Sequence, residues 1–245
     1  MEEVEYKFYT FLNPTQVELK SAFIKWLLSE YNVSTGSQIV DMGCGPGSML
    51  VALNGLGYKV TGYEPYQPFF EAAKQLENTD IEITKGGFLD IKGVDTYGAI
   101  MAINGPFSYL QSINERKMAI ELSYNALDHG GVLFLDNPNF PWILKHYREP
   151  LETKFHIDGI EAIRKPVHKI DFHQCTWIHT DHFSFVKEGD AHEISTEHHL
   201  AMIQLPEIYS HLNAIGFKNI KTFNSYESRI DEPINSSRMM IAAQK

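Results

Sequence analysis

A glycine-rich turn follows a short apolar segment that ends in a carboxylate. The segment Gln38-Ile-Val-Asp41 leads into Gly43-Cys44-Gly45-Pro-Gly47, and then into the apolar stretch Ser48 to Asn54. Glycines at alternating positions let the backbone approach a ligand closely and adopt positive φ angles. This order of strand, glycine turn and helix predicts a ligand site at the turn.

Two further carboxylates lie at or just after predicted strand ends. Glu64 ends the strand predicted over 58–64, and Asp90 follows the strand predicted over 81–84. In an open parallel sheet, ligands bind outside the carboxyl ends of the strands. We therefore expect Asp41, Glu64 and Asp90 to surround one site. Solvated strand ends are the alternative, but that alternative leaves their joint spacing with the glycines unexplained.

Apolar spacing predicts the elements that position these residues. Strands and helices alternate up to about residue 136, a pattern typical of a parallel sheet covered by helices on both faces. The predicted strands are 38–41, 58–64, 81–84, 98–103 and 132–136, and the predicted helices are 15–31, 48–54, 67–76 and 114–126.

A different pattern begins near residue 150. Three long segments alternate apolar and polar residues, which predicts an antiparallel sheet, and Glu188-Gly-Asp190 is expected to form a hairpin turn. These segments are 160–173, 175–187 and 192–203, and they are followed by a predicted helix at 205–212 and predicted strands at 217–223 and 238–243.

These patterns divide the chain into four parts. They are an N-terminal helical lid segment (1–36), a cofactor-binding core (37–140), an antiparallel β cap over the substrate (141–203), and a closing helix and β-hairpin (204–245) that complete the core sheet.

The charge balance disfavours polyanionic partners. The 21 basic and 31 acidic residues give a formal net charge of −10, and the basic residues form no run. Nucleic acids and anionic membranes attract clustered Lys and Arg, so neither partner is expected. The N-terminus has no apolar signal segment, which favours a cytoplasmic location. A homodimer is a possible assembly.

The motifs resemble those of the class I S-adenosylmethionine (SAM) methyltransferases. The spacing G-x-G-x-G after a strand-end Asp is similar to motif I of that family, and later segments continue the resemblance in order. These segments are Glu64, Phe88-Leu89-Asp90, Ala102-Ile-Asn104, Leu127-Asp-His-Gly-Gly-Val132 and Gly216-Phe217. The resemblance implies a Rossmann-like, seven-stranded, doubly wound α/β sheet with an antiparallel β cap inserted after the fifth strand.

The same resemblance implies SAM as the cofactor and a role for each motif residue. Asp41 would orient the glycine turn and reach the methionine amino group, and Glu64 would accept hydrogen bonds from the ribose hydroxyls. The remaining implied contacts are Gly43, Cys44, Gly45 and Gly47 around the methionine and ribose, Leu89 and Asp90 at the adenine, and Ala102 and Asn104 at the methionine end.

Segments of the predicted cap resemble small-molecule N-methyltransferases that act on amino sugars. These are Leu135-Asp-Asn-Pro-Asn-Phe-Pro-Trp142, Asp181-His-Phe183 and Glu197-His-His199-Leu200. The resemblance implies methylation of an amine on a small molecule, with O-methylation as the alternative. Candidate substrate-binding residues are Tyr9, Tyr109, Trp142 and Arg238.

Three of these candidates have an alternative interpretation. Trp142, with Phe140, could line an acceptor pocket or could belong to the core. Tyr9, with Tyr6, could close over the cofactor as a lid or could pack against the first helix. Arg238 could face an anionic group of the substrate or could be a surface ion-pair partner.

Histidines are concentrated in and around the predicted cap. Of eleven, all but His129 lie between His146 and His211. The spacing matches no zinc motif, so no metal site is expected. A catalytic base is plausible at His146, His182 or His199, and surface or hydrogen-bonded cap histidines are the alternative. Because strand side chains alternate, the adjacent His198 and His199 cannot both face one pocket.

Two other functions remain open at the level of sequence. An NAD-type oxidoreductase would use a G-x-G-x-x-G turn, but here the third glycine comes one residue early. A non-catalytic SAM-binding protein would bind the cofactor without transferring its methyl group.

Overall fold

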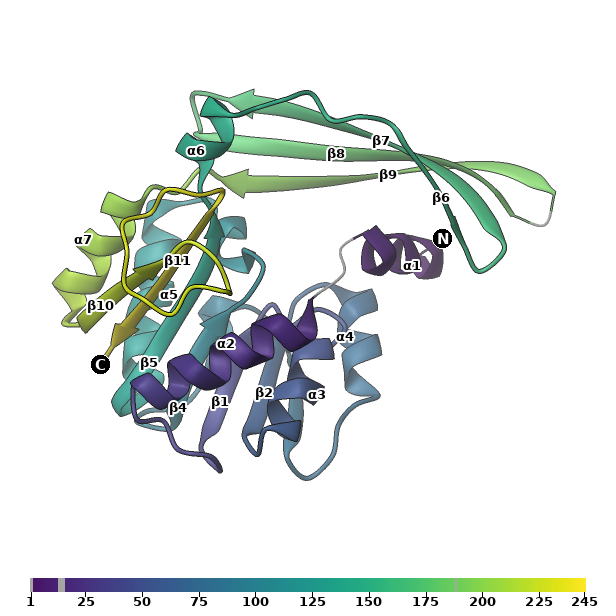
Figure 1. Cartoon of the computed structure of the whole chain (residues 1–245). Coiled ribbons are helices and arrows are strands. Elements are labelled where there is room, and N and C mark those ends of the chain that lie inside the picture. Colours follow the sequence, from purple (N-terminus) through teal and green to yellow (C-terminus); the bar gives the residue numbers. More distant parts are fainter. Residues whose placement is uncertain (1, 13–15, 188) are drawn as a thin grey trace.

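A seven-stranded sheet forms the centre of the computed structural model, which describes residues 2–12, 16–187 and 189–245 (Figure 1). The strand order is β10-β11-β5-β4-β1-β2-β3. Strands β1 to β5 run parallel, whereas β11 is antiparallel to both β5 and β10. Their bounds are β1 Gln38–Met42, β2 Lys59–Glu64, β3 Ile81–Lys85, β4 Tyr97–Ala102, β5 Leu127–Pro138, β10 Lys218–Phe223 and β11 Arg238–Gln244. The predicted α/β class and doubly wound sheet are confirmed.

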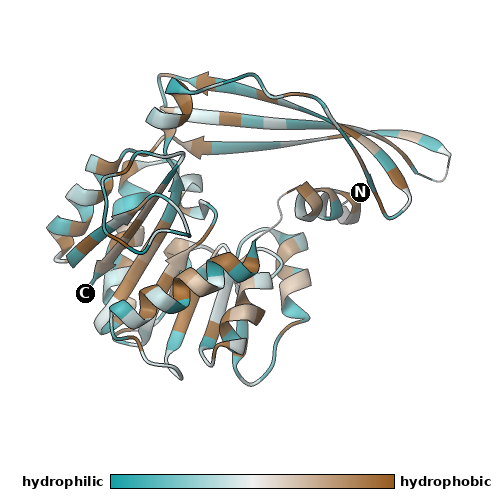
Figure 2. Ribbon diagram, in the orientation of Figure 1, coloured by the Kyte–Doolittle hydropathy of each residue, from teal (hydrophilic) through white to brown (hydrophobic). Residues whose placement is uncertain are grey.

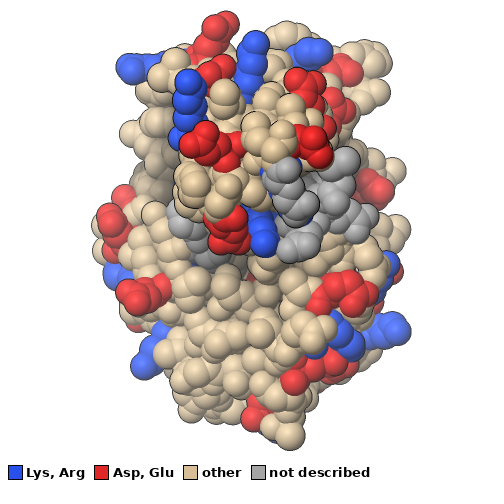
Figure 3. All heavy atoms as spheres, turned by 90° about the vertical axis from the view of Figure 1, so that its right-hand side faces the viewer, with Lys and Arg blue, Asp and Glu red and all other residues tan. Residues whose placement is uncertain are grey.

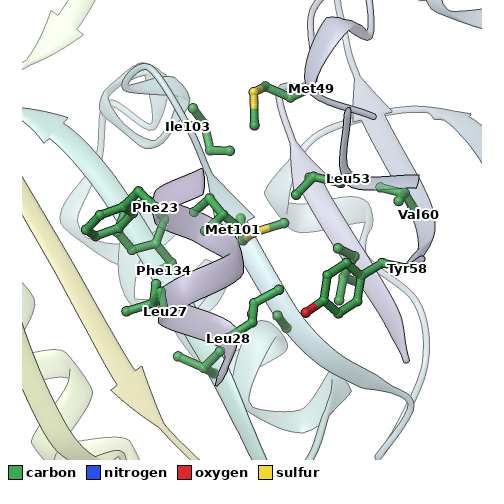
Figure 4. Packing of buried hydrophobic residues seen from close by; sticks show 14 of the residues in the cluster. Phe23, Leu27, Leu28, Met49, Leu53, Tyr58, Val60, Met101, Ile103 and Phe134 are labelled. Carbon is green, nitrogen blue, oxygen red and sulfur yellow. The ribbon is translucent and has the colours of Figure 1, made fainter. Parts of the chain in front are cut away.

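Helices cover both faces of this sheet because successive strand residues point to opposite sides. On β4, Met101 belongs to the apolar cluster beneath one set of helices and Ile100 to the cluster beneath the other. Figure 4 shows Phe23 and Leu27 packing towards Met101 and Phe134 of the sheet. The first set is α2 (Val17–Glu30), α3 (Ser48–Gly55) and α4 (Gln67–Lys74); the second is α5 (Ile113–Ala126) and α7 (Leu205–Ile215).

The predicted N-terminal lid segment is divided between two locations. Helix α2 packs on the sheet through Phe23, Ile24 and Leu27 and so belongs to the core layer. Only α1 (Glu2–Leu12) lies beside the cap (Figure 1). The helix predicted over 15–31 corresponds to α2, and its predicted first residue, 15, lies outside the described residues.

The cap is a four-stranded antiparallel sheet in the order β6-β7-β8-β9. Its strands are β6 Thr153–Ile157, β7 Ile160–Asp171, β8 Thr176–Lys187 and β9 Asp190–Ala201. Three of them match the predicted alternating segments, while β6 was not predicted. Helix α6 (Phe140–Lys145) leads from β5 into this sheet, which confirms an insertion after the fifth strand. Figure 2 shows hydrophobic and polar residues alternating along the cap strands.

Aromatic contacts join the cap to the core. Phe8 of α1 is fully buried, with its ring centroid 5.1 Å from that of Phe183 in β8. One residue along the helix, the Tyr9 ring lies 4.9 Å from Phe69 of α4. Helix α1 therefore bridges the cap and the core sheet's helices, and Tyr9 packs on α4.

Charged residues of both signs are interspersed over the face of the molecule seen in Figure 3. Within the described ranges, no helix is both long and apolar enough to cross a membrane.

Candidate functional site

The glycine turn has one position that is open to a ligand. Gly43, Gly45 and Gly47 all have positive φ angles, of 70°, 57° and 90°. A Cβ atom on Gly43 would lie 2.5 Å from Pro106 Cβ, and one on Gly47 would lie 2.6 Å from Leu76 Cδ1. A Cβ atom on Gly45 would meet nothing within 4 Å. The outer glycines therefore permit close packing, and Gly45 presents bare backbone to open space.

Cys44 turns its side chain away from this open position. The residue is buried, and a Cβ atom added to Gly62 of β2 would lie 2.7 Å from the Cys44 sulfur. Burial raises the pKa of the thiol, so it stays protonated. Cys44 can contribute its backbone to a ligand site, while its thiol packs against β2.

Glu64 holds the turn in place from the end of β2. Its carboxylate accepts hydrogen bonds from the backbone N–H groups of Gly45 and Tyr66, each at 2.8 Å. The residue is only 5% exposed, and burial raises its pKa against the opposing effect of these two hydrogen bonds. Each carboxylate oxygen keeps a further lone pair, so Glu64 can still accept from ligand hydroxyls.

Asp41 is a buried carboxylate with an unused acceptor. It lies at the end of β1 with 2% of its surface exposed, and its Oδ1 has no hydrogen-bond partner among the described residues. Burial, and then the negative charge of Glu64, raise its pKa to about 8, although Lys20 opposes the shift. A buried acceptor without a partner is costly, and a ligand ammonium group would satisfy it.

Asp41→Asn is expected to remove part of the pH dependence of stability. Because the pKa is raised from 3.8 to about 8, the folded protein binds a proton here that the unfolded chain releases. The free energy of unfolding should therefore fall as the pH rises through this window, and the variant should be the more stable protein near neutral pH. Urea denaturation at several pH values measures this dependence, and Asp80→Asn, at an exposed site, is the control. If the free energy of unfolding changes with pH in the same way in wild type and in Asp41→Asn, the prediction is wrong.

Lys20 belongs to the site but was not among the sequence candidates. Its side chain is buried, contacts the Asn104 side-chain oxygen, and has a pKa lowered by burial in spite of Asp136. The sequence did contain a signal for it, because Lys20 falls on the apolar stripe that continues through Phe23 and Leu27. A lysine on such a stripe is unusual unless it has a polar partner.

The predicted contacts after β3 and β4 lie at the same edge of the sheet. Leu89 and Asp90 form an exposed 3-10 turn, η1 (Phe88–Asp90), where the Asp90 carboxylate accepts from the Gly87 N–H at 2.8 Å. Ala102 is fully buried, so only its backbone can face a ligand. The Asn104 N–H donates to Asp136 at 3.0 Å, in a left-handed conformation with φ of 72°.

Arg238 is engaged in an ion pair. Its Nε donates to the carboxylate of Asp136 at 2.7 Å, and Asp136 also accepts from the Tyr226 hydroxyl at 2.6 Å. Asp136 is fully buried on β5, next to β11. Arg238 is thus an ion-pair partner, but of a buried carboxylate of the core and not of a surface group as the alternative from the sequence had it.

Tyr9 and Tyr109 lie in the same part of the molecule as Glu64. Tyr109 ends the 3-10 turn η2 (Pro106–Tyr109), which follows β4. Although Tyr109 is 51% exposed, the protein around it displaces water and, together with the charges of Tyr9 and Glu64, raises the pKa of its hydroxyl. Burial and the charge of Glu64 also raise the pKa of Tyr9. Trp142 lies apart from them on α6, with its ring stacked 4.1 Å from that of His146.

The three histidines predicted as possible bases do not come together. His146 is exposed at the end of α6, and its Nδ1 lies 2.8 Å from the Trp142 carbonyl oxygen. His182 and His199 are exposed on the cap face opposite Trp177, Phe183 and His198. His182 there lines a surface hollow of about 330 Å³ on the outside of the cap. The geometry therefore favours His198 over these two as the histidine that faces the core.

Comparison with known proteins agrees with this geometry. Residues 39–131 match the family described as "Methyltransferase domain". A candidate methyltransferase of Geobacillus sp. strain WCH70 is 22% identical over 138 residues, which make up 55% of this chain and 56% of that protein. The chain thus matches about half the length of this curated relative.

Solved structures match nearly the whole chain. DesVI of Streptomyces venezuelae has a TM-score of 0.79 at 16% identity, covering 97% of this chain and 95% of its own. The sugar N-methyltransferase KedS8 of Streptoalloteichus has a TM-score of 0.77 at 16% identity, covering 97% and 91%. An S-adenosylmethionine-dependent methyltransferase of Clostridium acetobutylicum has the same score and identity, covering 97% and 96%. Residues 39–131 thus match a methyltransferase domain, and the chain shares the fold of these solved structures, one of which is an S-adenosylmethionine-dependent methyltransferase.

Proposed function

We propose that this protein is a SAM-dependent methyltransferase that methylates a nitrogen atom of a small molecule. One observation carries the proposal. The open backbone at Gly45 lies beside Glu64 and the unpartnered carboxylate oxygen of Asp41, at the carboxyl edge of a methyltransferase domain. This edge is where the fold places its ligands.

The donor groups at this edge fit the polar parts of SAM. Asp41 has an acceptor for the methionine ammonium group, and Lys20 can pair with the methionine carboxylate. Glu64 can accept from two ribose hydroxyls while it holds Gly45 in place. At the exposed η1 turn, Asp90 and the backbone of Leu89 can meet the adenine edge. Asn104 completes the methionine end through its contact with Lys20.

When bound, SAM supplies a methyl group on a positively charged sulfur, so its activation is already present in the cofactor. The protein's contribution is then to position the acceptor, to exclude water and to receive a proton. The cap and α1 are suited to the first two tasks, because Phe8 joins them to each other and Tyr9 joins α1 to the core.

An amine is the favoured acceptor. KedS8, one of the similar structures, is a sugar N-methyltransferase, and the cap motifs resemble such enzymes. Tyr9 and Tyr109 are proposed to line the acceptor site. Trp142, on α6 where the chain passes from β5 into the cap, is proposed as a further lining residue. Arg238 is left to its ion pair with Asp136. A homodimer, a cytoplasmic location and the absence of nucleic-acid and membrane partners stay predictions from the sequence.

Two measurements test this function. Calorimetry should detect binding of SAM and of S-adenosylhomocysteine at micromolar concentrations. A mass-spectrometric screen of amines, amino sugars and phenols should then find a mass gain of one methylene unit on an amine. If only phenols gain this mass, the reaction is O-methylation and not N-methylation. If neither SAM nor S-adenosylhomocysteine gives a measurable heat of binding, the proposed function is wrong. If SAM binds but no acceptor gains a methyl group, a non-catalytic SAM-binding protein is favoured.

A further inference from the structure

Three histidines lie side by side on the cap face that turns towards the core. His168 of β7 is paired in register with His179 of β8, which is paired with His198 of β9. All three are half-buried, in contrast to the exposed His182 and His199 on the other face. In the described part of the chain, no group of three or more His, Cys, Asp or Glu side chains is arranged to hold a metal ion. The row therefore needs another explanation.

A buried carboxylate supplies a permanent negative charge next to this row. Arg164 donates to both oxygens of Asp181, at 2.7 and 2.9 Å, and His179 Nε2 lies 3.0 Å from the same carboxylate. Although burial alone would raise it, the hydrogen bonds from His179 and Arg164 lower the pKa of Asp181 to about 2. His179 also contacts His168, with Nδ1 and Nε2 separated by 2.7 Å.

His198 reaches across from the cap to the core. Its Nδ1 lies 2.9 Å from the hydroxyl of Tyr109, on the turn that follows β4. The position is secured by Gln111, whose side-chain amide donates to the His199 carbonyl oxygen at 2.7 Å. The cap and the core are thus joined at the contact between Tyr109 and His198, two side chains that can exchange a proton.

The protonation states of this pair are complementary. The raised pKa of Tyr109 keeps its hydroxyl protonated. Burial, and then the positive charge of His179, lower the pKa of His198, with a smaller opposing effect from Asp181 and a further lowering by His199. Arg164 and His168 lie on β7, on the far side of His179 and Asp181 from His198. The phenol therefore donates to a neutral imidazole whose Nδ1 can receive the proton.

We propose that Tyr109 and His198 act as one unit that removes the proton from the acceptor amine. The inference rests on the proposed function, since it needs an acceptor ammonium group beside the Tyr109 hydroxyl. The ammonium gives a proton to the Tyr109 oxygen while the tyrosine passes its own proton to His198 Nδ1. The amine recovers its lone pair for attack on the methyl group, Tyr109 is regenerated as a phenol, and His198 becomes an imidazolium near Asp181. The imidazolium later returns the proton to water.

The test compares Tyr109→Phe, His198→Asn and the double variant with wild type. The substrate is the amine that gives the largest mass gain in the screen above. Both single variants should lose about 10²-fold in kcat, the usual contribution of general acid–base catalysis. The double variant should lose no more than either single one, because residues that act as a unit are not additive. His156→Asn, at an exposed cap position, serves as the matched control and should retain the wild-type rate.

The pH profile distinguishes this role from a purely structural link between cap and core. In wild type, kcat should fall on the acid side as His198 becomes protonated, and this limb should disappear in His198→Asn. Binding of S-adenosylhomocysteine should stay within about twofold of wild type in every variant. A kcat loss below about fivefold, or an acid limb that survives in His198→Asn, overturns the proposal.

An independent titration covers the case in which no amine is methylated. Imidazole NMR should show that Tyr109→Phe changes the pKa of His198 but leaves that of His156 unchanged. An unchanged His198 titration overturns the Tyr109–His198 unit. Failure of S-adenosylhomocysteine to bind wild type would instead overturn the proposed function, so the two failures are distinguishable.

Discussion

Replacing Glu64 by alanine is expected to weaken the binding of S-adenosylhomocysteine more than about tenfold, or about 1.4 kcal/mol. The carboxylate holds the backbone of Gly45 at 2.8 Å and keeps lone pairs that ribose hydroxyls can use. Hydrogen bonds to a charged group contribute about 1.5–3 kcal/mol each, so the loss of the ribose contacts alone accounts for the effect. Isothermal titration calorimetry measures it directly.

Two companion variants show whether the effect belongs to the carboxylate. Glu64→Gln keeps the size and one accepting oxygen, and should bind with an affinity between those of wild type and Glu64→Ala. Glu71→Ala removes an exposed carboxylate of α4, which accepts a hydrogen bond from the Gln67 side chain, and should leave binding unchanged. If Glu64→Ala binds as tightly as Glu71→Ala, Glu64 does not contact the cofactor.

Replacing Arg238 by alanine should lower the free energy of unfolding by about 3–5 kcal/mol. Its partner Asp136 is fully buried and would lose the cation to which it is hydrogen-bonded, keeping only the attraction of Lys20. The Tyr226 hydroxyl, at 2.6 Å, would still donate to it but carries no positive charge. Urea denaturation followed by far-UV circular dichroism gives the free energy.

Two further variants separate an unpaired buried charge from a loss of packing. Asp136→Asn combined with Arg238→Met should recover part of the stability, because the neutral amide leaves no buried charge and its oxygen can still accept from the Asn104 N–H and the Tyr226 hydroxyl. Lys74→Ala breaks the exposed pair with Glu77, at 2.7 Å, and should cost less than about 1 kcal/mol. If Arg238→Ala were as mild as Lys74→Ala, the guanidinium would be available for the anionic substrate group considered from the sequence.

Local patterns predicted most of the fold. Alternation along the chain placed the strands and helices of the sheet to within a few residues, because each element's apolar spacing is a property of that segment alone. Apart from β6, which was not predicted, the main difference in the strands is β5, which extends over Leu127–Pro138 and includes Gly130 and Gly131, before the strand predicted over 132–136. Residues 128–131 fall where the pairing of β4 with β5 shifts register, and Gly130 keeps a positive φ of 82°. The two glycines therefore form an irregular stretch within the strand, where their backbone hydrogen-bonds to that of Lys245.

The cofactor side of the candidate site could also be predicted from sequence. Asp41, Gly45 and Glu64 lie within 24 positions, and the loop joining each parallel strand to its helix brings them to one edge. Lys20 could not be placed in the same way, because it contacts Asn104 across 84 positions of sequence. The stripe on α2 signals that Lys20 is buried, but only the packed structure reveals the partner.

Spacing within short segments was enough to predict the glycine turn, its carboxylates and an alternating cap. Which face of the cap turns inward, and which charges are paired, depends on contacts between segments that are far apart in the sequence. Tyr109 meets His198 across 89 positions, and Arg238 meets Asp136 across 102. Strand alternation separates His198 from His199, but it cannot say which of them faces the core. That choice depends on how the cap docks, through the burial of Phe8, Phe183 and Trp177.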